Sequence, residues 1–140
     1  MINFNIEIEK FRITERRKKK RWLNDLISQE NFNLLELNYI FLNDDALLKI
    51  NKEYLNHDTY TDIITFDNSE EKKSIEGDIF ISVDRIRENA LMFRVSFETE
   101  MIRVMAHGLL HLCGYLDKKK KDIKNMREKE NYYLEQYGKF

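Results

Sequence analysis

Two histidines four residues apart, followed by a glycine and an aspartate, are the residues best suited to chemistry. His107, His111, Gly114 and Asp117 form the pattern H-x-x-x-H-x-x-G-x-x-D within the most apolar helical run of the chain. One turn of α-helix places both imidazoles on one face. A glycine three residues later can end the helix with a positive φ, so the turn can return Asp117 toward the same point. Three protein ligands with an open fourth position are what a catalytic zinc ion requires.

Each candidate ligand also has a simpler explanation. Paired helix histidines are often satisfied by hydrogen bonds alone, and loop aspartates are often only solvated or capping. The positions of Gly114 and Asp117 match the metzincin-type pattern H-x-x-x-H-x-x-G-x-x-H, which favours a metal site. A carboxylate in place of the third imidazole is an acceptable zinc ligand but makes the site harder. We therefore expect one divalent ion, zinc, while the identity of the metal stays open.

Gly108 restricts the class of reaction. Zinc peptidases place a glutamate directly after the first histidine, where it deprotonates the metal-bound water. Glycine has no such group, so a peptidase of that type is disfavoured. A metal that supplies hydroxide or acts as a Lewis acid toward phosphate is the remaining route. Glu98 and Asp62 both stay open as general bases.

Two basic runs, at 16–21 and 118–121, have different implications. A solvated helix face is the usual explanation for either run. Four lysines directly after Asp117 would also favour a polyanionic substrate. The net charge of the chain is −1, so nucleic-acid binding would have to come from a local patch of this kind. The candidate substrate-binding residues are Lys118, Lys119, Lys120 and Lys121.

The remaining reactive side chains have ordinary explanations. Cys113 is the single cysteine, which excludes an internal disulfide and fits a reducing cytosol, and we expect it to be a small buried hydrophobe. His57 lies in a polar segment and is expected on a surface loop. No apolar run approaches the ~18 residues of a membrane span, and a strand pattern begins at Ile2. We therefore expect neither a signal peptide nor a membrane span, and a cytoplasmic protein.

Apolar periodicity predicts the elements that must position these residues. Of the 140 residues, 42% are hydrophobic and 35% charged, which suits one soluble domain covering residues 1–140. The element order indicates an α+β fold with one small mixed sheet and helices around it. Thr14 is the expected N-cap of the first helix, and 69–74 is expected to be a charged loop. The predicted strands are 2–8, 35–42, 63–66 and 76–82, and the predicted helices are 14–27, 43–54, 83–93, 96–111 and 119–137.

Several segments resemble the YbeY family, the bacterial metal-dependent endoribonucleases implicated in ribosomal RNA maturation. The family hallmark H-G-x-L-H-L-x-G-Y-D-H corresponds to residues 107–117, and the likeness runs from about Leu47 to the C-terminus. The segments T-[DN]-V-L-S-F and G-D-I-x-I-S correspond to 61–66 and 77–82, and Met126 and Glu130 fit the M-x-x-x-E of the last helix.

The departures from the family pattern fall close to the chemistry. The third histidine of the family is Asp117 here, and the aspartate before it is Leu116. The arginine that usually follows a tyrosine is Leu55, and the proline before the threonine is Tyr60.

The resemblance implies a mixed four-stranded sheet surrounded by about five helices, with a zincin-like metal helix packed on it. It also implies a single-strand-specific endoribonuclease that acts in rRNA maturation near the small ribosomal subunit, with His107, His111 and Asp117 on zinc. Lys118 to Lys121 would then hold RNA, and we expect a monomer. The alternative is a non-enzymatic ribosome assembly factor with a structural or vestigial metal, which Leu55 and Asp117 favour.

Overall fold

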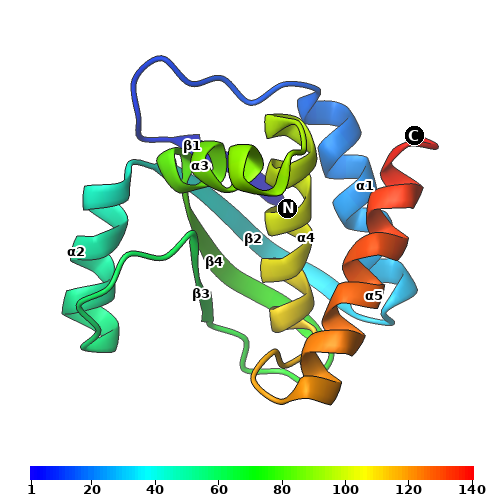
Figure 1. Ribbon diagram of the computed structural model, residues 1–140. Helices are drawn as coiled ribbons and strands as arrows, with labels where there is room; N and C mark the ends of the chain where they lie inside the picture. The colour runs from blue at the N-terminus through cyan, green and yellow to red at the C-terminus, as the bar shows by residue number, and fades with distance from the viewer.

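A mixed four-stranded sheet with helices on both faces organises residues 1–140, all of which the computed structural model describes (Figure 1). The predicted α+β class, the element order and the five helices are confirmed. The elements are β1 (Ile2–Ile6), α1 (Arg16–Gln29), β2 (Asn33–Leu42), α2 (Asp44–Leu55), β3 (Ile63–Asp67), β4 (Ser74–Ser82), α3 (Val83–Phe93), α4 (Phe97–Leu112) and α5 (Lys120–Tyr137).

The strands lie in the order β1-β2-β4-β3. β1 is parallel to β2 and β2 is parallel to β4, while β3 runs antiparallel along the outer side of β4. The central pair is in register with Tyr39 opposite Ile79. Both of these residues are fully buried, because their side chains point to the face of the sheet that α4 covers.

The helices divide between the two faces of the sheet. α1, α4 and α5 lie on one side, and α2 lies on the other, over a small separate core (Figure 1). On the larger side, the Tyr39 hydroxyl donates to the carbonyl of Met105 at 2.8 Å, which ties α4 to β2. The Trp22 indole donates to the carbonyl of Tyr133 at 2.7 Å, which ties α1 to α5. No helix combines the length and the apolar character needed to cross a membrane.

Gly108 sets how closely α4 approaches the sheet. A Cβ at this position would lie 2.7 Å from Ile63 Cδ1 and 3.0 Å from Ile79 Cγ2. Ile79 is fully buried in β4 and has no room to withdraw. The helix that carries both histidines therefore sits against β3 and β4 at a distance that only glycine allows.

The start of α1 differs from the prediction. Glu15, with φ 51°, is the N-cap residue and makes no side-chain cap, so Thr14 is not the cap. The Thr14 hydroxyl instead donates to Glu98, and its carbonyl accepts from Lys19 Nζ at 2.6 Å. Lys19 is buried and also binds the Glu98 carboxylate, so one member of the first basic run is structural rather than solvated.

Four strand ends also differ from the prediction, because pairing partners decide where a strand ends. β2 begins at Asn33 rather than 35, and β3 ends at Asp67, which pairs with Gly77, rather than at 66. β4 begins at Ser74 rather than 76, since Ser74 pairs with Asn33 of β2. β1 ends at Ile6 rather than 8, since its last partner is Phe41, next to the end of β2. Ile8 packs against the core without joining the sheet.

We expect Gly108→Ala to destabilise the protein by about 1 kcal/mol or more. Overpacking of a rigid core costs about 1–3 kcal/mol, which exceeds the gain of about 0.5–1 kcal/mol from replacing a helical glycine. Chemical denaturation of both proteins measures the difference. Gly138→Ala is the control, because its Cβ would meet only the Glu135 carbonyl, at 3.4 Å. Equal stability of the two variants would contradict the packing role of Gly108.

Candidate metal centre

The two histidines of α4 and Asp117 bring three side-chain atoms to one point. Nε2 of His111 lies 3.0 Å from Nε2 of His107 and 3.1 Å from Oδ2 of Asp117. Nε2 of His107 lies 3.2 Å from the same carboxylate oxygen. The structure therefore unites the three candidate ligands that the sequence spacing predicted.

The turn after α4 makes this convergence possible. α4 ends at Leu112, and Gly114 adopts a φ of 97°, as the sequence predicted for this glycine. The amide of Gly114 donates to the carbonyl of His111 at 2.9 Å, and the amide of Tyr115 donates to the carbonyl of Leu110 at 3.0 Å. These bonds fold the chain back across the end of the helix, so Asp117 reaches the histidines.

Hydrogen bonds at the far ring nitrogens fix which nitrogen of each histidine carries the proton. Nδ1 of His111 lies 2.8 Å from the carbonyl oxygen of Tyr115, which can only accept. Nδ1 of His107 lies 2.7 Å from a carboxylate oxygen of Glu130. Both Nδ1 atoms therefore donate, and in the neutral rings both Nε2 atoms present a lone pair toward the centre.

Three lone pairs that face one another at 3.0–3.2 Å repel unless a metal ion lies among them or one ring is protonated and donates to Asp117. Ligands held about 2.1 Å from a tetrahedral zinc ion stand about 3.4 Å apart, close to the observed separations. Two imidazoles and one carboxylate are also a donor set that zinc accepts. The residues therefore fit a divalent ion with an open fourth position, and their role as its ligands is a hypothesis that rests on this geometry.

Glu130 supports His107 from α5. The residue is only 4% exposed, and Arg103 donates to its other oxygen at 3.0 Å. Burial raises the pKa of Glu130, but the hydrogen bonds from His107 and Arg103 outweigh it and hold the pKa below its usual value. Burial likewise lowers the pKa of His107, and Glu130 together with the charges of Asp117 and Asp62 raises it above its usual value. The ring is thus held in a negative environment that favours a bound cation.

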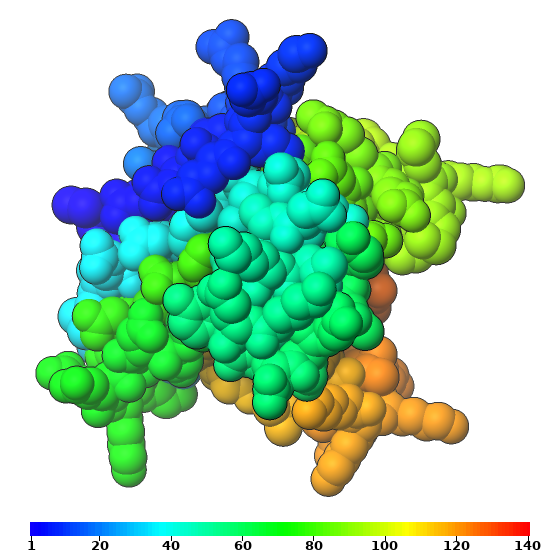
Figure 2. Space-filling model, turned by 90° about the vertical axis from the view of Figure 1, so that its left-hand side faces the viewer, coloured from blue at the N-terminus to red at the C-terminus, as the bar shows by residue number.

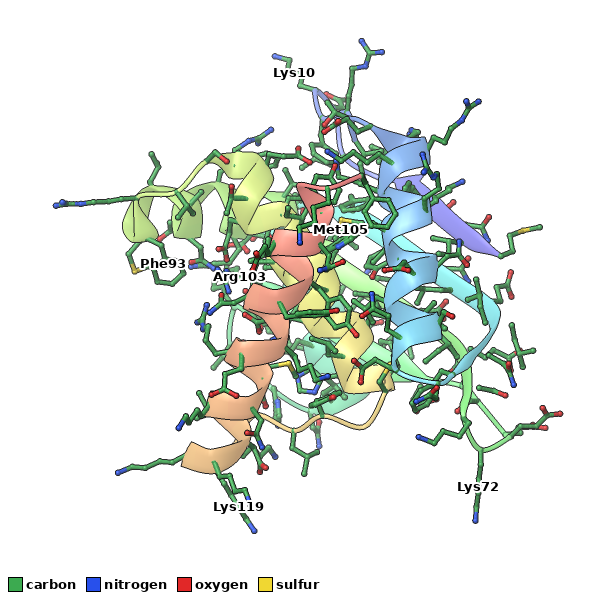
Figure 3. All side chains as sticks on the ribbon, turned by 90° about the vertical axis from the view of Figure 1, so that its right-hand side faces the viewer. Lys10, Lys72, Phe93, Arg103, Met105 and Lys119 are labelled. Carbon is green, nitrogen blue, oxygen red and sulfur yellow. The ribbon has the colours of Figure 1, made fainter.

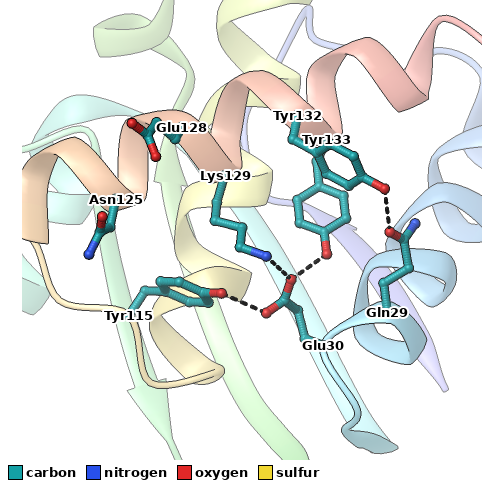
Figure 4. A pocket seen from close by; sticks show the side chains of 8 residues that line it. All are labelled: Gln29, Glu30, Tyr115, Asn125, Glu128, Lys129, Tyr132 and Tyr133. Atoms are coloured by element: carbon teal, nitrogen blue, oxygen red, sulfur yellow. Dashed lines mark hydrogen bonds and ion pairs between the residues drawn. The ribbon is translucent and has the colours of Figure 1, made fainter.

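Glu30 supports His111 through Tyr115. The Tyr115 hydroxyl donates to one oxygen of Glu30 at 2.8 Å, while Tyr133 and Lys129 of α5 bind the other oxygen (Figure 4). Tyr115 is therefore fixed at its ring end by Glu30, and its carbonyl holds His111. The chain Glu30–Tyr115–His111 connects the C-terminal end of α1 to the metal centre.

The two candidate bases lie in different places. Glu98 is bound by buried Lys19 at the opposite end of α4 from the histidines, so it cannot serve this site. Asp62 lies just before β3 and lines the same depression as His107. Burial raises the pKa of Asp62, and the charges of His107 and Arg85 act against this shift without cancelling it. Of the two candidate bases, Asp62 is therefore the one that the structure places beside the centre.

A groove of about 600 Å³ opens in front of His111. Its walls include Lys118 and, on the loop after α2, the exposed His57, so the prediction of a surface loop for His57 is confirmed. Leu55, 40% exposed, also lines it. Figure 2 shows this side of the molecule, with α2 and the following loop in front and the start of α5, in orange, beside them.

Cys113 takes no part in the centre. It is half-buried rather than buried as predicted, and it packs against the main core. Burial, with a smaller contribution from Glu30, raises the pKa of its thiol to about 12. A thiol held in this form is neither a metal ligand nor a nucleophile at neutral pH.

The supporting residues were harder to find in the sequence than the candidate ligands. Glu130 fits a family motif in the sequence, but the motif gives it no role, and its contact with His107 is visible only in the structure. Glu30 gives no sequence signal, because it lies 85 residues from Tyr115.

Comparison with known proteins decides the family. The family model described as Endoribonuclease YbeY matches residues 3–138. The chain belongs to the YbeY family. The match begins near the N-terminus, so it extends well beyond the region from Leu47 onward in which the sequence motifs lie.

Individual relatives agree with this assignment. The protein named Endoribonuclease YbeY from Cytophaga hutchinsonii is 50% identical over 95% of this chain and 93% of its own length. The protein of the same name from Flavobacterium johnsoniae is 53% identical over 94% of this chain and 93% of its own length. The solution structure of TM1509 from Thermotoga maritima is similar with a TM-score of 0.69 and 28% identity, over 98% of this chain and 89% of that one.

We expect Glu130→Gln to weaken metal binding by about 10- to 100-fold, the usual effect of losing a hydrogen-bond partner of a metal-bound histidine. The amide can present its NH₂ group to Nδ1 of His107 and so favour the wrong tautomer. Titration with Zn²⁺ against a competing chelator gives the affinity. Glu128→Gln, an exposed carboxylate on the same helix, is the control and should bind as the unaltered protein does. If both variants bind zinc with the same affinity, Glu130 does not support the metal centre.

Proposed function

We propose that this YbeY-family chain is an endoribonuclease that cleaves single-stranded RNA at a divalent ion, zinc, held by His107, His111 and Asp117. The observation that carries the proposal is the convergence of three acceptor atoms at 3.0–3.2 Å beside an open groove. The shared name of the relatives, Endoribonuclease YbeY, supports the reaction class. We further propose ribosomal RNA of the small subunit as the substrate.

The residues of the chain divide the work around that centre. A divalent ion bound there would activate water and neutralise charge that develops on a scissile phosphate. Glu130 and the Tyr115 carbonyl keep both imidazoles turned inward, so no reorganisation is needed when substrate binds. Asp62, beside His107, can accept or return a proton. Gly108 contributes no base and serves packing instead.

The lysines at 118–121 support an RNA-binding role at the mouth of the groove. All four are exposed, and none forms an ion pair within the protein. Lys120 and Lys121 also occupy the first turn of α5, where the helix dipole disfavours positive charge. A charge cluster kept in an unfavourable position next to Asp117 is consistent with a polyanionic substrate.

A non-enzymatic assembly factor with a vestigial metal is the weaker alternative. Leu55 and Asp117 favour it, but the two histidines retain complete hydrogen-bond support and the relatives carry an enzyme name. We also propose that residues 1–140 act as one domain, as a monomer and in the cytoplasm. The continuous core of 27 buried residues that joins the sheet to α1, α4 and α5 supports the first of these.

Replacing a candidate ligand should remove both the metal and the cleavage. We expect about one zinc ion per chain in the unaltered protein, and loss of most of it in His111→Ala and Asp117→Ala, because two ligands hold zinc far more weakly than three. Elemental analysis measures the metal, and a labelled single-stranded RNA reports cleavage. Asp58→Ala, which removes another loop aspartate, is the control. Full metal content in Asp117→Ala would exclude the third ligand, and cleavage that persists in His111→Ala would place the activity elsewhere.

Lys119→Gln should lower the affinity for RNA and should also make that affinity less dependent on salt concentration. Each lost phosphate contact lowers the slope of log affinity against log salt by about 0.7 for single strands. Fluorescence anisotropy of a labelled RNA, at several salt concentrations and with the metal removed to prevent cleavage, measures this slope. Lys72→Gln is the control, because Lys72 projects into solvent well away from Lys119 (Figure 3). Equal slopes in the two variants would contradict a role for Lys119.

A further inference from the structure

A second depression adjoins the metal centre on the side of His107. It has a volume of about 210 Å³ and is separate from the groove in front of His111. Its walls include Phe93, Glu100, Arg103 and Asp62. The volume equals that of about seven liquid water molecules, which one planar heterocycle can displace. The metal centre thus has the groove on one side and a smaller pocket on the other.

Phe93 provides an aromatic wall that the fold leaves uncovered. It is the last residue of α3 and is 56% exposed, whereas the core of α3 is formed by Val83, Ile86 and Ala90. Figure 3 shows it at the end of α3, near Arg103. An exposed aromatic ring beside a candidate nuclease centre is a surface on which a nucleobase can stack.

Glu100 provides a buried carboxylate without a partner. It is 3% exposed and lines the pocket, yet no hydrogen bond or ion pair within the protein reaches its side chain. The neighbouring Arg103 is engaged by Glu130 and Asn131 instead. The first turn of α4 favours a negative charge at this position but supplies no side-chain donor. Its carboxylate oxygens open onto the pocket and have no partner in the protein, so they are free to accept a hydrogen bond from a group that enters it.

We propose that this pocket is a nucleobase subsite, in which one base of the RNA stacks on Phe93 and donates its exocyclic amino group to Glu100. The inference rests on the proposed function, because it assigns a specificity site to the same RNA. The phosphate next to this base would point toward His107 and the metal centre, and Arg127, exposed at the rim, can contact the backbone.

The chemistry of the pocket selects among the four bases. Adenine, cytosine and guanine each offer an amino group to a carboxylate. Uracil offers only one ring N–H, flanked by two carbonyl oxygens that Glu100 and Asp62 would repel. The pocket therefore favours bases with an amino group over uracil at one fixed position relative to the cut. A base held this way is unpaired and unstacked from its strand, which accounts for a preference for single-stranded RNA.

Cleavage of an RNA with a randomised single-stranded segment, followed by sequencing of the cut ends, tests the subsite. For the unaltered protein we expect uracil to be depleted at one position near the cut. Phe93→Ala should lower kcat/KM by roughly 5- to 100-fold, the effect of losing one base–aromatic stack, while Phe93→Tyr should retain it. Glu100→Gln should abolish the discrimination against uracil while metal content is unchanged. Leu91→Ala removes a more exposed apolar side chain from α3 outside the pocket, and it should change neither kcat/KM nor the discrimination against uracil.

Different failures lead to different conclusions. If both Phe93→Ala and Glu100→Gln cleave RNA with the same base preference as the unaltered protein, the subsite proposal is overturned and the nuclease proposal is left intact. Loss of a bound metal ion in Glu100→Gln would make the pocket a cation site instead. If the unaltered protein cuts no RNA, the proposed function fails, and NMR titration with cytidine and uridine still tests the pocket. Cytidine should then shift amide signals around Phe93 and Glu100 more than uridine does, and equal or absent shifts would contradict the proposal.

Discussion

The mutual repulsion of three lone pairs is the constraint on which the rest of this structure depends. Nε2 of His107, Nε2 of His111 and Oδ2 of Asp117 face one another at 3.0–3.2 Å, and none carries a hydrogen that the others can accept while both rings are neutral. A metal cation relieves this repulsion at all three atoms, whereas a proton on one ring relieves it only for the pair of atoms that it bridges. The surrounding structure therefore has to hold the three groups in place before the cation arrives, because in its absence they would move apart.

Helix α5 provides much of that support, although it carries none of the three candidate ligands. Glu130 fixes the His107 ring directly, and Lys129 and Tyr133 fix Glu30, which holds Tyr115 and through it His111. Two ligand positions on α4 thus depend on one helix that lies beside it (Figure 1). Damage to the packing of α5 should consequently reach both histidines at once, without any change in the ligands themselves. Gly108 acts from the other direction by setting the distance between α4 and the sheet.

Local sequence signals predicted the candidate ligands and the order of the elements. The contacts that support the centre could not be predicted, because they join residues far apart in the sequence. The i, i+4 spacing, the glycine with positive φ and the returning Asp117 are features of one short segment, so the candidate centre could be found without a structure. Alternating and helical periodicity gave the element order for the same reason. The supports of the centre are distant in sequence: Glu30 meets Tyr115, and Glu130 meets His107, only after folding. The prediction of Thr14 as a helix cap was wrong, because buried Lys19 draws the Thr14 carbonyl and Glu98 into a different hydrogen-bond network. The proposed nucleobase pocket could not be predicted either, because it joins α3, α4 and α5, which no local sequence pattern relates.

The most direct test of this account is anomalous diffraction at the zinc edge from crystals of the protein grown with zinc and without chelator. We expect one peak, about 2.1 Å from Nε2 of His107, Nε2 of His111 and Oδ2 of Asp117, with the fourth position facing the groove. A map in which Asp117 points to solvent, both Nε2 atoms bind protein groups and no metal lies between them would contradict the account.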